Sequence, residues 1–195
     1  NSTILFSYSR ISYLESYAFT QLKSIRIQFV RSWIGVIRSN AFFEAGGVDG
    51  VHFTESKIDV IEGYAFSGMK MNREASLTFN LCNIRNTSTH AFSGIESIST
   101  IQLLNINAQR IQAGAFTSVQ HLTSLMVESC YVDVMESQAL SGLVSLESLS
   151  LRYNVVRCMG HNILADASYL GPHINPWELL AYNRFPITSN PYGSE

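Results

Sequence analysis

The stretch Leu122–Val156, LTSLMVESCYVDVMESQALSGLVSLESLSLRYNVV, contains one complete repeat and the start of the next. Three of its apolar residues recur 24 positions later (146−122, 149−125 and 151−127): Leu122 as Leu146, Leu125 as Leu149 and Val127 as Leu151. A constant period of this size, with apolar residues spaced as L-x-x-L-x-L-x-x-N/C-x-L, predicts a solenoid in which each repeat adds one strand to a parallel sheet.

The same period extends through most of the chain. An alanine followed by an apolar residue marks each repeat, at Ala18-Phe19, Ala41-Phe42, Ala65-Phe66, Ala91-Phe92, Ala115-Phe116 and Ala139-Leu140. We expect these rings to stack as a continuous spine, because small alanine allows close approach and the ring fills the space between coils. Alternation predicts seven strands with the inward pairs Ile4/Phe6, Ile25/Ile27, Val51/Phe53, Leu77/Phe79, Ile101/Leu103, Leu125/Val127 and Leu149/Leu151.

This repeat resembles the typical, about 24-residue class of animal extracellular leucine-rich-repeat proteins, whose repeats carry Ala-Phe before Gly-Leu. BspA-like repeats of microbes and protists are similar, but there the last strand residue and the next spine isoleucine are about seven positions apart. Here the separation is eight, as from Phe6 to Leu14 and from Phe53 to Ile61, which favours the typical class. The resemblance implies an α/β solenoid, a leucine-rich-repeat horseshoe with a parallel β-sheet on its concave face and irregular or 3-10 segments on its convex side.

Local departures from the period predict irregular coils. Ile27 and Ile37 are ten positions apart, which predicts a two-residue bulge around Arg31-Ser32-Trp33, and residues 70–74 lengthen the repeat between Met69 and Leu77. A serine or cysteine satisfies buried backbone groups less completely than asparagine does. The inward N/C position is read as Ser9, Ser56, Cys82, Ile106, Cys130 and Asn154.

The period divides the chain into a solenoid of about seven repeats, residues 1–157, and a non-repeat C-terminal tail or cap, residues 158–195. All four prolines lie in this tail, and loss of period together with proline marks the end of a solenoid. Within it, Asn175-Pro176-Trp177-Glu178 has the features of a helix start, so a short helix is expected near 176–182.

Composition and charge exclude several classes of function. Charged residues make up 14% of the chain and the formal net charge is −2, with no cluster of Lys or Arg. We therefore expect no nucleic-acid partner, and no apolar run reaches the roughly 18 residues of a membrane span. Two triplets beginning at Asn1 and Asn86 match the N-glycosylation acceptor pattern. Together with the repeat type, they indicate a secreted or extracellular glycoprotein.

The sequence indicates no catalytic residue, no cofactor and no metal site. Cys158 and His161 form a single Cys-x-x-His, which lacks the second ligand pair of a structural zinc site. Cys82 and Cys130 stand two repeats apart, so their Cα atoms should be separated by about 9–10 Å, beyond the reach of a disulfide. Cys158 remains a candidate for an intermolecular disulfide.

The outward strand positions form the candidate binding surface. They combine small hydroxyl residues, which also suit a merely solvated strand, with apolar and aromatic residues that tend to mark interaction sites. The predicted partner-binding residues of this concave face are Leu5, Tyr8, Arg26, Gln28, Phe29, His52, Thr54, Thr78, Asn80, Leu81, Gln102, Leu104, Met126, Glu128, Arg152 and Tyr153.

These features predict a non-enzymatic extracellular module, of the receptor or adhesion kind, that recognises another protein. An accessory non-catalytic subunit of a secreted enzyme or assembly, and a self-associating matrix protein, are alternatives. Ile4, Phe6 and Ile11 begin the first coil without a polar coil before them. Because terminal repeats need a polar outer edge, we expect a partner chain or a missing segment to cover that end.

Overall fold

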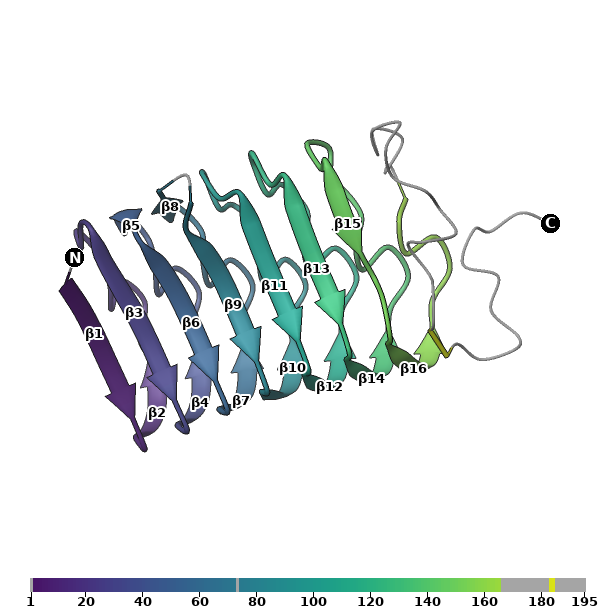
Figure 1. Ribbon diagram of the computed structural model, residues 1–195, viewed down its shortest axis with the longest axis horizontal. Helices are drawn as coiled ribbons and strands as arrows, with labels where there is room; N and C mark the ends of the chain where they lie inside the picture. Colours follow the sequence, from purple (N-terminus) through teal and green to yellow (C-terminus); the bar gives the residue numbers. More distant parts are fainter. Residues whose placement is uncertain (1, 73, 166–182, 185–195) are drawn as a thin grey trace.

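The computed structural model describes residues 2–72, 74–165 and 183–184, which wind into successive coils stacked along the longest axis (Figure 1). The first strands of the coils form a parallel seven-stranded sheet, here called the first sheet. Its strands, in spatial order, are β1 (Ser2–Ser7), β3 (Ile25–Val30), β6 (Gly50–Thr54), β9 (Ser76–Asn80), β11 (Thr100–Leu104), β13 (Ser124–Glu128) and β15 (Ser148–Ser150).

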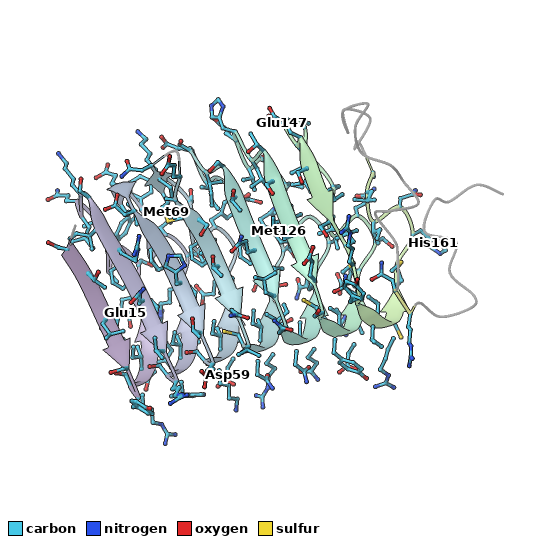
Figure 2. The ribbon with its side chains drawn as sticks, viewed as in Figure 1. Glu15, Asp59, Met69, Met126, Glu147 and His161 are labelled. Carbon is cyan, nitrogen blue, oxygen red and sulfur yellow. The ribbon has the colours of Figure 1, made fainter. Side chains whose placement is uncertain are left out.

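Each first-sheet strand is followed along the chain, after a turn, by one strand of a second parallel seven-stranded sheet. Its strands are β2 (Arg10–Leu14), β4 (Trp33–Ile37), β7 (Lys57–Ile61), β10 (Asn83–Thr87), β12 (Asn107–Ile111), β14 (Tyr131–Met135) and β16 (Val155–Met159). Figure 2 shows side chains projecting from both sheets, with Met126 on the first sheet and Asp59 on the second.

This second sheet corrects the expected architecture. Irregular or 3-10 segments were expected outside the first sheet, but only the return path that carries the Ala-Phe pairs consists of turns. The described residues contain no helix, so the α/β fold class is not confirmed. For the same reason, the described part of the chain has no helix that could cross a membrane. The expected helix near 176–182 lies outside the described residues.

The register of the second coil also differs from the expectation. Ile27 and Phe29 are both fully buried and stand opposite Ile4 and Phe6 of β1. The inward pair is therefore Ile27/Phe29, whereas the sequence predicted Ile25/Ile27. With this register the segment around Arg31-Ser32-Trp33 is an ordinary turn, and the predicted bulge is wrong.

Two stacks of phenylalanine rings fill the centre of the solenoid. The return-path spine was predicted and is confirmed for Phe19, Phe42, Phe66, Phe92 and Phe116, with successive ring centroids 4.8, 5.0, 5.7 and 4.6 Å apart. A second stack joins the first-sheet strands through Phe6, Phe29, Phe53 and Phe79, at 4.8, 4.7 and 4.7 Å. Edge-to-face contacts such as Phe29 with Phe19 connect the two stacks. Ring packing at these distances fixes how each coil sits on the next.

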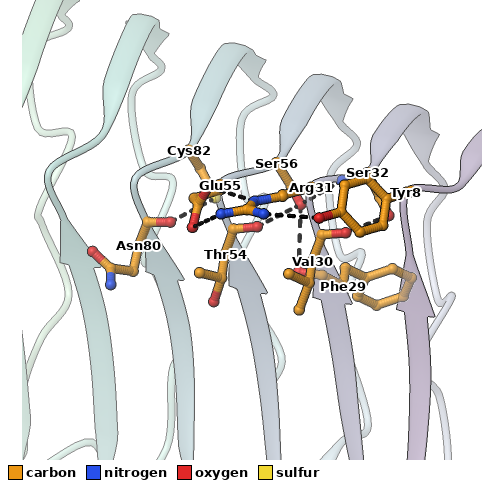
Figure 3. A network of polar contacts seen from close by, with 10 residues as sticks. All are labelled: Tyr8, Phe29, Val30, Arg31, Ser32, Thr54, Glu55, Ser56, Asn80 and Cys82. Carbon is orange, nitrogen blue, oxygen red and sulfur yellow. Dashed lines mark hydrogen bonds and ion pairs between the residues drawn. The ribbon is translucent and has the colours of Figure 1, made fainter.

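A ladder of side chains at the N/C position also joins successive coils (Figure 3). The Ser32 hydroxyl accepts the Ser9 N–H at 3.1 Å and lies 3.0 Å from the Val30 carbonyl, and the Ser56 hydroxyl accepts the Ser32 N–H at 3.1 Å. Serine thus bonds both backbone donors and acceptors here, so the coils are regular where irregularity was expected.

The ladder continues to the C-terminal end of the described chain. Asn154 accepts the Cys130 N–H at 2.9 Å and donates to the Val127 carbonyl at 2.7 Å. Asn183 repeats both contacts one coil further on, accepting the Asn154 N–H at 2.7 Å and donating to the Leu151 carbonyl. Asn183 therefore occupies the ladder position of the following coil.

Each coil turns at three corners where the backbone is left-handed, with φ between 49° and 76°. The first corner comprises Tyr8, Arg31, Glu55, Leu81, Asn105, Ser129 and Tyr153. The second comprises Tyr17, Asn40, Tyr64, His90, Gly114, Gln138 and Asn162, and the third comprises Gln21, Glu44, Gly68, Gly94, Ser118 and Gly142. Non-glycine residues rarely adopt this conformation, but hydrogen bonds to the next coil hold it, as from the Arg31 N–H to the Thr54 carbonyl at 3.0 Å.

One lengthened repeat and the C-terminal end of the coils depart from the regular pattern. The lengthened repeat between Met69 and Leu77 is observed. β8 (Lys70–Met71) pairs with β5 (Gly46–Val48), and the extra residues lie between Met71 and Leu77, because Met71 stands opposite Val48 while Leu77 stands opposite Val51. At the other end, β16 continues past residue 157, and Ile163 is buried beyond it. The coiled part therefore extends further than the boundary predicted at residue 157.

Candidate binding surfaces

The outward side chains of the first sheet form a continuous surface, here called the first-sheet face. Its three columns, in the observed register, are Thr3, Arg26, Gly50, Ser76, Thr100, Ser124 and Ser148; then Leu5, Gln28, His52, Thr78, Gln102, Met126 and Ser150; then Ser7, Val30, Thr54, Asn80, Leu104, Glu128 and Arg152. The first left-handed corner forms its rim. Most side chains in these three columns are half-buried by their neighbours, so the surface has low relief.

Fifteen of the sixteen predicted binding residues lie on this face or its rim, and one does not. Phe29 was predicted at the rim, but it is fully buried between Phe6 and Phe53. The true rim residue of that coil is Arg31, which the sequence analysis missed. Aligning Phe29 with the strand phenylalanines of the adjacent coils would have revealed this register.

Arg31 is the centre of a polar network on the rim (Figure 3). Its guanidinium donates to Glu55 at 2.7 and 3.3 Å and to the Tyr8 hydroxyl at 2.8 Å. These hydrogen bonds raise the pKa of Arg31, and the bond from Arg31 lowers the pKa of Glu55. Because all three side chains are exposed, the network contributes little to stability but presents a fixed arrangement of charge and aromatic surface.

Side-chain hydrogen bonds also order the middle of the first-sheet face. The Thr78 hydroxyl lies 3.1 Å from the Gln102 carboxamide oxygen and 3.0 Å from the Ser76 hydroxyl, and Gln102 reaches the Met126 sulfur at 3.7 Å. His52 stands in the same column, where burial and the nearby Arg26 lower its pKa. The face therefore presents ordered polar groups that lose little side-chain freedom on binding.

The outer face of the second sheet carries a groove of about 570 Å³, here called the outer groove. It is lined by Val60, Arg85, Asn86, Gln109, Arg110, Gln112, Asp133, Val134, Arg157 and Cys158. Arg110 pairs with Glu136 at 2.7 Å, and Arg157 pairs with Asp133 at 3.2 Å. The bond from Arg110 lowers the pKa of Glu136. No local pattern in the sequence indicates this groove.

The cysteines are all unpaired in the structure. Cys82 and Cys130 are buried, and burial raises the pKa of each thiol to about 11. Cys158 is exposed, but it belongs to β16 and not to a tail beyond the repeats. A disulfide between chains at Cys158 stays a prediction.

The expected glycosylation and metal sites are only partly described. Asn86 lies half-buried within β10, while Asn1 falls outside the described residues. Within the described ranges, no three His, Cys, Asp or Glu side chains are grouped as a metal site would require.

Comparison with known proteins gives one family match. The family model described as "BspA type Leucine rich repeat region" matches in six copies, over residues 2–106 and 35–170. No curated protein matches the chain. The match is to the repeat class that the spacing argument set aside, so the leucine-rich repeat is confirmed and the typical animal class is not.

Proposed function

Because the chain belongs to the BspA-type leucine-rich-repeat family, we propose that it is a non-enzymatic module that binds another protein through its first-sheet face. Leucine-rich repeats stack into extended binding surfaces of this kind. Binding of this kind requires neither a cofactor nor a reactive side chain.

The observation that carries the proposal is the exposed apolar surface around the first-sheet face. Leu5, Tyr8, Leu81 and Tyr153 are between 55% and 73% exposed. The other exposed large apolar side chains among the described residues lie elsewhere on the coils, and they are Tyr13, Tyr17, Tyr64, Tyr131 and Val144. Tyrosine is enriched among the anchors of protein interfaces, and exposed apolar residues such as these leucines tend to mark interaction sites. Arg31, held between Tyr8 and Glu55, adds a residue type that is enriched at such anchors.

A photo-crosslinking amino acid at Thr78 provides the first experiment. Applied to the native extract, it should join the protein to a specific partner, which mass spectrometry then identifies. The partner's affinity is next measured for Leu81→Asp and for Val144→Asp, a matched control because the two side chains are 55% and 54% exposed. A charge placed at a desolvated anchor should weaken binding at least about tenfold.

The control separates a specific site from a general effect of charge. Val144 follows a third-corner residue and lies off the first-sheet face, so Val144→Asp should leave affinity within about twofold. Equal loss in both variants, or no loss in Leu81→Asp, would contradict the assignment of the partner to this face.

We also propose that the protein acts outside the cell, as the glycosylation triplet at Asn1 suggests. Asn86 is half-buried within β10 and lines the outer groove, so a glycan is expected at Asn1 and not at Asn86. A glycan on Asn1 would retard the native protein on electrophoresis until an N-glycosidase removed it, and Asn1→Gln should abolish that shift. A native protein with unmodified Asn1 that fractionates with cytosolic markers would count against the extracellular location.

A further inference from the structure

The outer groove crosses five neighbouring strands of the second sheet, from Val60 on β7 to Cys158 on β16. Adjacent strands are about 4.8 Å apart, so four steps give a length of roughly 19 Å. An extended peptide rises about 3.3 Å per residue. The groove therefore accommodates about six residues of an extended chain lying along the solenoid axis.

The charge of the groove is positive although the chain as a whole carries −2. Its lining contains three arginines and a single acidic residue, Asp133. Arg110 and Arg157 each already pair with a carboxylate, whereas Arg85 is exposed and has no ion-pair partner among the described residues. One strand away, Asp59 instead accepts the Trp33 indole N–H at 3.0 Å and lies 3.6 Å from Lys57. The groove thus offers one free guanidinium.

The remaining lining residues favour a peptide over a polyanion. Val60 and Val134 provide apolar floor on either side of Asn86 and Arg110 in one row of the sheet. Asn86 and Gln109 have carboxamides without a side-chain partner among the described residues, and a carboxamide both donates and accepts, as a peptide backbone requires. A sulfated glycan would need a row of free cations.

From this arrangement we infer that the outer groove binds an extended acidic peptide segment, whose Asp or Glu carboxylate pairs with Arg85 in the bidentate geometry that guanidinium favours. Apolar side chains of the segment pack on Val60 and Val134. This site is on the second sheet, so it is independent of the partner that we propose for the first-sheet face.

A displayed library of random seven-residue peptides tests the inference with the whole chain as target. The expected outcome is enrichment of one Asp or Glu flanked by apolar residues. The best peptide, labelled with fluorescein, should lose about tenfold or more in affinity when its acid is changed to amide or when Arg85 is changed to Gln. Arg85→Gln removes no ion pair among the described residues, and an unchanged thermal unfolding midpoint would verify that the fold persists.

Three comparisons complete the design. Lys23→Gln removes another exposed cation that has no ion pair with any residue the structure describes, on a different side of the coil. Leu81→Asp alters the first-sheet face, and both variants should leave peptide affinity within about twofold. A labelled heparin hexasaccharide is tested in parallel. The inference is overturned if the enriched peptides share no acid, if Arg85→Gln binds as tightly as the parent, if Leu81→Asp abolishes binding, or if only the hexasaccharide responds to Arg85→Gln.

Discussion

Replacing Phe29 with alanine tests the register on which the first-sheet face depends. In the structure the ring is fully buried, stacks on Phe6 and Phe53 at 4.8 and 4.7 Å, and meets Phe19 edge-on at 6.2 Å. Phe→Ala in a core costs about 3–5 kcal/mol, and stacked pairs add about 0.5–1.5 kcal/mol beyond the buried area. We expect a loss of about 4 kcal/mol in the free energy of unfolding.

Ile25→Ala is the matched comparison, because Ile25 would occupy an inward position if the register predicted from the sequence were right. In the structure Ile25 is the first residue of β3 and is only half-buried. Its truncation should therefore cost about 1 kcal/mol. In the other register the order reverses, with about 2–5 kcal/mol for Ile25 and less than about 1 kcal/mol for an exposed Phe29.

Urea unfolding followed by circular dichroism gives both values from the midpoint and slope of each transition. An Ile25→Ala loss larger than the Phe29→Ala loss would refute the register, and with it the assignment of Arg31 to the rim. A third variant, Arg31→Ala, should cost less than about 1 kcal/mol because its partners are exposed.

Three further predictions rest on the same structure. Ser32→Ala should cost about 1–3 kcal/mol, because it leaves the Ser9 N–H without its acceptor; a urea midpoint equal to the parent's would show that the ladder adds no stability. Ser118→Gly should stabilise by about 0.5–1 kcal/mol, since φ is 59° at Ser118 and glycine adopts that conformation without strain; Ser124→Gly, within β13, should destabilise instead, and the same sign for both would contradict the corner argument. The folded-state pKa of His52 is lowered, so the unfolded chain binds more protons between that pKa and about 6.5, and stability falls as pH drops through this window; the fall measured from pH 7.5 to 5.5 should be smaller in His52→Gln, and an identical fall would sink this account.

The sequence was sufficient for the stacked coils and for the return-path spine, because both follow from apolar residues at one constant period. The second coil was ambiguous, since Ile25, Ile27 and Phe29 all fit an alternating strand. Contact with Phe6 and Phe53, in neighbouring coils, decides between the two registers. Local alternation does not contain that information.

The second sheet was missed because its strands do not alternate strictly. In β10, for example, Ile84 and Thr87 point inward three positions apart, and the residues between them face outward or lie half-buried. The outer groove was missed for a related reason. Its lining residues come from five coils, and its ion pairs join residues 24 to 26 positions apart, so no local stretch of sequence contains the pattern.

The hydrogen bonds of both sheets run between coils, along the direction in which the coils stack. A force that separates the two ends of the solenoid therefore acts parallel to these hydrogen bonds and breaks them sequentially, a few at a time. Each released coil would lengthen the chain by up to about 80 Å for a 24-residue repeat. Under tension the molecule would extend in steps of one coil, at forces well below those of domains whose strands must slide past one another.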